Sequence, residues 1–263
     1  MILTIFSNLK KIGTIQAAMI REIGKYFIFL GQLFSNREPL KTYYRLTLDE
    51  CVSVGLGSAF LVALVSTFMG AVTTVQTAFN MVSPLIPNYV ISQVVREMTV
   101  LELAPTIIAI IYAGKVGTGM AGGLGTMRIT EQIDALEVMG INSISYLVLP
   151  KIIASMLMYP LLVILAGACA LMGGYIVGTV TGIISPNDYV YGIRYTFNEF
   201  TITFALIKSI VFAFLVASIS SYMGYYTRGG ALEVGISSTQ AVTNSVIAIL
   251  LADYLLAQLL LGK

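Results

Sequence analysis

Long apolar stretches separated by short polar connections dominate the pattern of hydrophobic and polar positions along the chain. A helix that crosses the hydrocarbon core of a bilayer needs about 20 mostly apolar residues. The pattern places such spans near residues 52–79, 90–114, 150–180, 201–226 and 238–261. Proline and glycine punctuate the connections, as at Pro84, Pro87 and Gly229. The pattern therefore predicts an all-α integral membrane protein with about five transmembrane helices.

The N-terminal part has a different pattern, because apolar residues recur there at helical spacing with basic residues off the stripe. The stripe within residues 2–34 consists of Phe6, Leu9, Ile12, Met19, Ile23, Phe27, Leu30 and Phe34. This spacing predicts an amphipathic helix lying in the membrane interface, with a helix packed on a soluble core as the alternative. We therefore divide the chain into an N-terminal interfacial helix and connection, residues 1–47, and a transmembrane domain, residues 48–263.

Composition excludes several classes of function. Only 11% of the residues are charged and 57% are hydrophobic, which leaves too little charge to cover a water-soluble surface. The formal net charge of +2, without a basic cluster, argues against a nucleic-acid partner. The chain has no histidine, the commonest general base and metal ligand, so we expect no catalytic or metal site. Cys51 and Cys169 lie in separate apolar runs, and we expect no disulfide.

The distribution of basic residues predicts the orientation in the membrane. Cytoplasmic loops of membrane proteins carry an excess of lysine and arginine. Most of the basic residues fall on one predicted side: Lys10, Lys11, Arg21, Lys25, Arg37, Lys41, Arg45, Lys115, Arg128, Lys151 and Arg228. We therefore expect a cytoplasmic N-terminus, and an odd number of spans then leaves the C-terminus outside the cytoplasm.

A polar segment between the second and third spans, residues 126–140, carries the clearest functional signal. Its apolar positions recur at helical spacing, its carboxylates lie elsewhere, and Gly140 is a suitable helix stop. The pattern predicts a short amphipathic helix at the cytoplasmic face, suited to docking a soluble partner; a solvated loop helix is the alternative. The candidate docking residues are Arg128, Glu131, Gln132, Asp134, Leu136 and Glu137.

Two nucleotide-binding patterns can be assessed near this segment. Residues 117–122 satisfy G-x-G-x-x-G, but that fingerprint needs a preceding buried strand, and here a predicted membrane span precedes it. The chain contains no G-x-x-x-x-G-K-[ST] pattern. If ATP drives this protein, we expect another subunit to bind it.

From about residue 50 onwards the sequence resembles the MlaE-type permeases of ABC transporters, which move lipids between bacterial membranes. The most specific match is Gly125–Gly140, supported by Ala113–Gly117, Leu206–Ser209 and Leu251–Tyr254. The resemblance implies a permease homodimer in the bacterial inner membrane, with residues 126–140 as the coupling helix. It also implies a pair of cytoplasmic ATPase subunits, which hold ATP and Mg, and a periplasmic MCE-domain protein that carries lipid. No cofactor is expected on this chain itself.

The sequence departs from the family pattern in three places. The family usually has Ala-Glu-Leu-Gly where this chain has Gly122–Gly125, so an acid is missing at Gly123. The family's Arg-Glu-Leu-x-Pro appears as Leu101–Pro105 without the arginine, and Arg96 on the same span is the candidate to replace it. The match in the last cytoplasmic loop, Gly235–Val242, is weaker.

Several charged residues fall within or beside predicted spans, where an unpaired ionised side chain costs at least about 2.5–3.5 kcal/mol. They are Arg96, Glu97, Glu102, Lys208 and Asp253. We expect Glu102, Lys208 and Asp253 to meet in the interior of the bundle or dimer and to border a lipid-accepting cavity. Two alternatives remain open: a cluster that only fixes helix register, and the coupling site of an ion-coupled secondary transporter.

The apolar residues of the first span leave two interpretations open. Leu64, Phe68 and Val72 could line the lipid cavity or could face ordinary bilayer.

Overall fold

The computed structural model describes residues 21–34, 39–81 and 87–261, and these residues form helices without strands. Residues 21–32 form a helix that we call the N-terminal helix. The other elements are α2 (Leu40–Asn80), α3 (Tyr89–Met98), η1 (Thr99–Ile107), α4 (Ile108–Tyr112), η2 (Ala113–Gly117), α5 (Thr118–Ile129), α6 (Gln132–Val138), α7 (Ser143–Val180), α8 (Pro186–Arg194), α9 (Glu199–Tyr225) and α10 (Ala231–Leu261). The predicted all-α membrane fold is confirmed.

Within the described residues, four helices are long and apolar enough to cross a membrane: Lys41–Asn80, Ser143–Val180, Glu199–Tyr225 and Ala231–Leu260. They correspond to the first, third, fourth and fifth predicted spans. The second, residues 90–114, is helical throughout but is divided among α3, η1, α4 and η2. Both η segments are π-helical, and Pro105 inside η1 cannot donate a backbone hydrogen bond.

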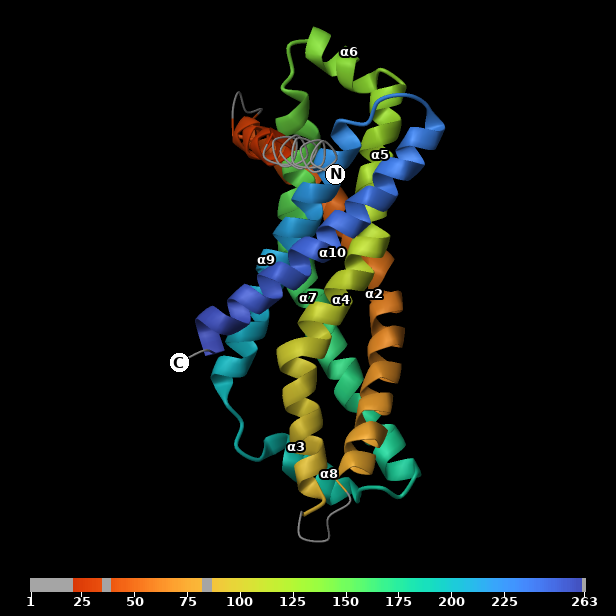
Figure 1. Ribbon diagram of the computed structural model, residues 1–263, viewed down its shortest axis with the longest axis vertical. Coiled ribbons are helices and arrows are strands. Elements are labelled where there is room, and N and C mark those ends of the chain that lie inside the picture. Colours follow the sequence, from red (N-terminus) through yellow and green to blue (C-terminus); the bar gives the residue numbers. More distant parts are fainter. Residues whose placement is uncertain (1–20, 35–38, 82–86, 262–263) are drawn as a thin grey trace, which may run out of the picture.

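The helices form an elongated bundle with two distinct ends (Figure 1). One end carries α6 and the N-terminal helix, and the other carries α8 and the start of α3. The segments from α3 to α5 run together from the α8 end to the α6 end, while α10 crosses the bundle diagonally. Helix α9 packs against α5, α7, α10 and η1. Helix α9 therefore contacts most of the other helices of the bundle.

Helices α2 and α7 pack closely because glycines face backbone at their crossing. A Cβ atom added at Gly70 would lie 1.8 Å from the carbonyl oxygen of Ala170, and one added at Gly173 would lie 2.1 Å from that of Thr67. Small residues that let two backbones approach are typical of helix interfaces in membranes. No larger side chain fits at these two positions without moving a helix.

The N-terminal helix lies against the α6 end of α9. Phe29 and Leu33 are its buried apolar residues, and the ring of Phe29 contacts Tyr222, Tyr225 and Tyr226. Part of the predicted interfacial stripe lies on the other face, where Ile23, Phe27 and Phe34 are exposed. Leu30, also predicted on the stripe, is half-buried and packs against the core, and the members before residue 21 lie outside the described residues. The helix thus has two apolar faces, one packed on the protein and one free to contact lipid.

Three spans begin earlier than predicted, at Leu40, Ser143 and Ala231, and two further segments differ in kind from the prediction. Residues 126–140 are not one helix: α5 ends at Ile129, a turn follows, and α6 begins at Gln132. Residues 186–194, predicted as a connection, form α8. Its start has a regular cap, because the Ser185 hydroxyl accepts a hydrogen bond from the Asp188 backbone N–H and Pro186 stands at the first helical position.

Candidate functional site

Both ends of α6 have a well-defined backbone conformation. Glu131 adopts φ 61°, a left-handed conformation that is uncommon outside glycine. At the other end Gly140 has φ 79°, the Gly140 N–H donates to the Glu137 carbonyl, and the Ile141 N–H donates to the Leu136 carbonyl. This pair of bonds is the Schellman motif, so Gly140 ends the helix as predicted.

The candidate docking residues surround this turn. Arg128 lies 2.7 Å from Asp134 and 3.9 Å from Glu137, measured between side-chain nitrogen and oxygen. Glu131 and Gln132 are exposed, and Gln132 donates a hydrogen bond to the Thr130 hydroxyl. Leu136 is half-buried beside the fully buried Ile133, which anchors α6. The acids therefore project from an anchored helix, with Arg128 bridging α5 to α6.

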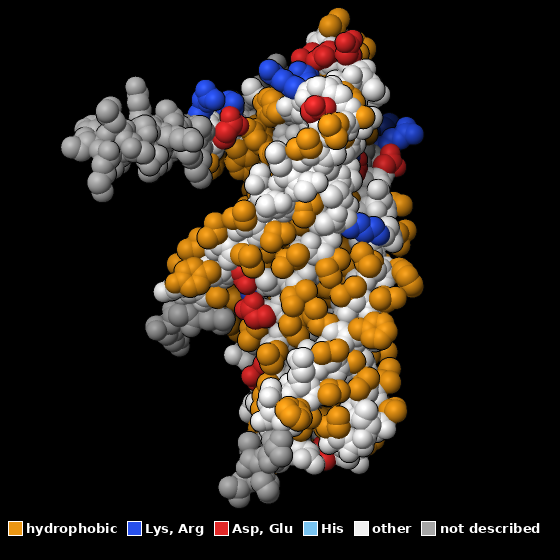
Figure 2. All heavy atoms as spheres, turned by 45° about the vertical axis from the view of Figure 1, so that its right-hand side comes forward, with side chains coloured by type: hydrophobic (Ala, Val, Ile, Leu, Met, Phe, Trp, Pro, Cys, Tyr) orange, Lys and Arg blue, Asp and Glu red, His pale blue; other side chains and the backbone are white. Residues whose placement is uncertain are grey.

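Two exposed apolar residues at this end were not among the predicted docking residues. Val138 is 90% exposed and Met139 is 65% exposed, and both lie at the end of α6. Charged side chains gather around this end of the molecule, whereas hydrophobic side chains cover the faces below it (Figure 2). Apolar side chains exposed beside charged groups, at the tip of a molecule, are typical of a protein–protein contact. The sequence did carry a signal for this exposure, because both residues stand immediately before Gly140, at the predicted end of the helix.

A three-residue cluster joins α6 to α9 and α7. The Tyr225 hydroxyl donates to the Glu137 carboxylate at 2.9 Å, and the Ser143 hydroxyl donates to the same oxygen at 3.0 Å. The two hydroxyl oxygens lie 2.8 Å apart, and the Arg128 guanidinium lies 5.7 Å from the centre of the Tyr225 ring. We call Glu137, Ser143 and Tyr225 the clasp. It connects α6 directly to the α6 end of α9 and to the start of α7.

The N-terminal helix contacts α9 one turn away from the clasp. Tyr26 and Ser218 share a hydrogen bond of 2.7 Å, and Tyr222 donates to Glu22 at 3.2 Å. A hydrogen bond from Lys25 lowers the pKa of the Glu22 carboxyl, and burial raises the pKa of the Tyr26 hydroxyl. Glu22 is therefore charged and Tyr26 neutral at neutral pH, which suits both bonds.

In the middle of the bundle the structure brings Lys208 of α9 together with Glu102 of η1 and Asp253 of α10. The Lys208 ammonium lies 2.5 Å from Asp253 and 3.0 Å from Glu102. The Lys208 side chain is 0% exposed, that of Asp253 18% and that of Glu102 48%. Thr106 lies within hydrogen-bonding distance of both carboxylates, at 3.2 and 3.3 Å. We call Glu102, Lys208 and Asp253 the ion cluster.

The ion cluster also supports the irregular helix η1. Pro105 has no N–H to donate to the Leu101 carbonyl four residues earlier, and the Lys208 ammonium donates to that carbonyl at 3.0 Å. On another side, the fully buried Tyr159 of α7 donates its hydroxyl to the Pro105 carbonyl at 2.6 Å. Side chains from α7 and α9 thus add hydrogen bonds to two carbonyls of the irregular helix, of which the Pro105 carbonyl also accepts the Ile108 backbone N–H.

Arg96 takes a different place from the one expected. Its guanidinium donates to the carbonyls of Ile193 at 2.7 Å and Tyr195 at 2.8 Å, and pairs with Glu97 at 3.0 Å. None of these groups belongs to the ion cluster. Instead it ties α3 to the chain that follows α8.

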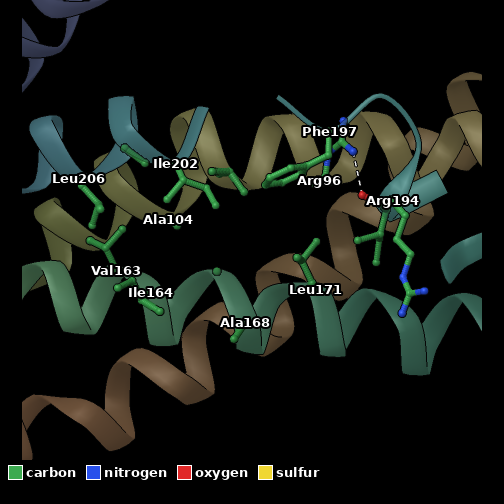
Figure 3. Close-up of a pocket in the computed structure, with 14 residues that line it drawn as sticks. Arg96, Ala104, Val163, Ile164, Ala168, Leu171, Arg194, Phe197, Ile202 and Leu206 are labelled. Atoms are coloured by element: carbon green, nitrogen blue, oxygen red, sulfur yellow. Dashed lines mark hydrogen bonds between the residues drawn. The ribbon is translucent and has the colours of Figure 1, made fainter. Parts of the chain in front are cut away.

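A cavity of about 520 Å³ opens between η1, α7 and α9 near Arg96. Its walls are almost entirely apolar, and side chains from the opposing helices point toward one another across it (Figure 3). Leu64, Phe68 and Val72 do not line this cavity; they form an exposed stripe on α2. That placement leaves them facing either bilayer or a second copy of the chain.

Neither cysteine is paired in the structure, in agreement with the sequence: Cys51 and Cys169 are free and half-buried. Among the described residues, no group of three or more His, Cys, Asp or Glu side chains is placed to hold a metal ion.

Comparison with known proteins gives consistent matches over most of the chain. The family described as Permease MlaE matches residues 47–259. A probable ABC transporter permease protein of Rickettsia bellii is 36% identical over 94% of this chain and 95% of its own length. One from Synechocystis sp. is 34% identical over 89% of each chain. Protein TRIGALACTOSYLDIACYLGLYCEROL 1 of Arabidopsis thaliana is 34% identical over 88% of this chain and 65% of its own length.

Proposed function

Because the chain belongs to the MlaE permease family, we propose that it is the permease subunit of an ABC transporter that moves phospholipid or a related lipid. In this proposal the lipid passes between the bacterial inner membrane and a periplasmic carrier with an MCE domain. A separate ATPase subunit binds and hydrolyses ATP with Mg, and this chain binds no cofactor. The permease works as a homodimer with two ATPase subunits.

The observation that carries the proposal is the geometry of α6. This short helix stands at one end of the bundle, presents Glu131 and Gln132 to solvent, and exposes the apolar Val138 and Met139 beside them. The buried Ile133 anchors it, so a partner that moves α6 also moves α5. We infer that the ATPase docks here.

The clasp would transmit a displacement of α6, caused by the docked partner, to the membrane-spanning helices. Force on α6 reaches α9 through Glu137 and Tyr225, whose hydrogen bond is 2.9 Å long. Helix α9 carries Lys208, which holds η1 and α10 through Glu102 and Asp253. ATP-driven displacement of α6 would therefore shift the helices that meet at the ion cluster.

Two observations support lipid as the cargo. The name of the Arabidopsis relative is that of a galactolipid. The exposed apolar stripe with Leu64, Phe68 and Val72 gives α2 a face suited to acyl chains, and in a dimer it would border a cavity between the copies.

The ion cluster was also the basis of the alternative, an ion-coupled secondary transporter. Membership of a family of ABC transporter permeases favours ATP as the energy source instead. Under this proposal Glu102, Lys208 and Asp253 hold three helices in register beside the lipid path.

We place the α6 end in the cytoplasm and the α8 end in the periplasm. Lys25 and Arg128 lie at the α6 end, together with the start of α2 and its Lys41 and Arg45. The C-terminus is then periplasmic. A reporter fused after Lys263 that is active only in the cytoplasm would contradict this orientation.

Charge reversal on α6 tests the docking role. We expect Glu131→Lys with Asp134→Lys to lose the ATPase subunit or to hydrolyse ATP without moving lipid, while the membrane fold stays intact. Because Asp134 also pairs with Arg128, Glu131→Lys alone is the cleaner variant, since Glu131 makes no ion pair with any of the described residues. Glu199→Lys reverses an exposed acid at the opposite end of the molecule and serves as control. Normal coupled transport by the double variant would refute docking at α6.

A further inference from the structure

The cavity between η1, α7 and α9 is separate from the ion cluster and has its own chemistry. Val100 and Ala104 form one wall, Val163 and Gly167 a second, and Ala205 of α9 a third. Its volume of about 520 Å³ falls in the middle of the range of about 300–1,000 Å³ that ligand sites occupy. Walls of this kind accept a hydrocarbon chain.

The polar groups of the cavity stand together at the α8 end. Figure 3 shows Arg194 beyond Leu171, at the end of the row of apolar side chains, with Arg96 and Phe197 on the facing wall. No acidic residue lines the cavity. The site therefore combines a hydrocarbon-accepting interior with a cationic mouth.

The two arginines are not equivalent. Arg96 is 5% exposed and already bonded to the Ile193 and Tyr195 carbonyls and to Glu97, so it holds the wall in place. Arg194 is exposed, and within the described part of the chain no hydrogen bond or ion pair engages its guanidinium. An unpaired guanidinium donates readily to phosphate oxygens, often through two parallel bonds. Arg194 is thus the group that would select an anionic headgroup.

We propose that this cavity is a binding site for an anionic glycerophospholipid from the leaflet at the α8 end, with its headgroup phosphate on Arg194 and an acyl chain between η1, α7 and α9. A bound chain would fill the cavity between η1, α7 and α9 and, because it binds the native state, would stabilise the fold. The site is separate from the proposed docking of an ATPase and from transport.

The test is a lipid titration of the purified full-length protein in detergent, followed by native mass spectrometry. We expect one phosphatidylglycerol per chain to bind about tenfold more tightly than phosphatidylcholine. Both lipids carry the phosphate, but the choline cation of phosphatidylcholine offsets its charge and is repelled by Arg194, whereas the phosphatidylglycerol headgroup keeps a net negative charge. Arg194→Gln should bring the two affinities together. Arg45→Gln, an exposed arginine at the opposite end, should leave the preference unchanged.

A cavity-filling variant separates this site from ordinary surface lipid. A Cβ added at Gly167 meets nothing within 4 Å, so Gly167→Leu can extend into the cavity without a backbone clash. It should lose one bound phosphatidylglycerol per chain and the thermal stabilisation that this lipid gives. Gly235→Leu, at an exposed helical glycine with equally open surroundings, should retain both.

Three results would overturn the proposal: equal binding of the two lipids by the unsubstituted protein, unchanged lipid binding by Gly167→Leu, or a change of oligomeric state by Gly167→Leu. The last result would mean that a second copy covers the cavity. None of these outcomes depends on ATP hydrolysis or transport, so the proposed function can fail or succeed independently.

Discussion

Replacing Lys208 by Met, which keeps the length of the side chain and removes its charge, should be among the most destabilising substitutions in the membrane part. The ammonium is fully buried and is the shared partner of two carboxylates, at 2.5 Å from Asp253 and 3.0 Å from Glu102. Removing it leaves both acids without their cation, Asp253 mostly buried and Glu102 half-exposed. Breaking a buried ion pair from one side typically costs about 3–5 kcal/mol.

The three members of the ion cluster should rank in a fixed order. Asp253 is 18% exposed, and Asp253→Asn still leaves Lys208 paired with Glu102, so we expect a loss of about 1–2 kcal/mol. Glu102 is 48% exposed and is the more distant partner, and Glu102→Gln still leaves Lys208 paired with Asp253, so we expect a loss of about 1 kcal/mol or less. Lys208→Met combined with Asp253→Asn should be more stable than Lys208→Met alone, because one of the two orphaned charges is gone.

The assay is the apparent melting temperature of the purified protein in one detergent, followed by fluorescence-detected gel filtration. At about 2–4 °C per kcal/mol for a chain of this size, Lys208→Met should lower it by about 6–20 °C. A Lys208→Met variant no less stable than Glu102→Gln would refute the reasoning. So would a double variant that is less stable than Lys208→Met.

Three further substitutions test other contacts. Gly173→Ala should prevent folding, because its Cβ would lie 2.1 Å from the Thr67 carbonyl oxygen, whereas Gly167→Ala should fold normally in the same expression assay. Tyr159→Phe should lower the free energy of unfolding by about 1 kcal/mol, since the Pro105 carbonyl loses its buried side-chain donor and keeps only the Ile108 N–H; an unchanged melting temperature would contradict this. Gly123→Glu should leave stability within about 0.5 kcal/mol, because its Cβ meets open space, so any change in transport would report on the acid itself.

The span pattern was readable from the sequence because bilayer thickness dictates the length of an apolar helix. Four predicted spans match helices that meet the length and composition of a membrane span. Hydropathy could not predict the irregular second span, because it carries no information on whether a helix such as η1 or η2 is π-helical. Pro105 was a visible signal for irregularity, but its partners Tyr159 and Lys208 come from other helices.

The candidate site was partly readable for a similar reason. Because a charge in lipid is costly, the sequence indicated that Glu102, Lys208 and Asp253 would pair with one another. In the structure both carboxylates lie within ion-pair distance of the Lys208 ammonium. The break at Glu131 was not readable, because a left-handed glutamate has no local sequence signature. Nor was the clasp, since Tyr225 lies 88 positions from Glu137 and only the fold brings them together.

The central claim is that a separate ATPase, docked on α6, drives lipid movement through this chain. Its most direct test is reconstitution of the permease with its ATPase subunits in liposomes that hold labelled phospholipid, with an MCE-domain acceptor outside. We predict that lipid transfer requires both ATP hydrolysis and the ATPase subunit, and that Glu131→Lys abolishes the coupling. Equal transfer by the permease alone, driven by an ion gradient and indifferent to ATP, would contradict the account.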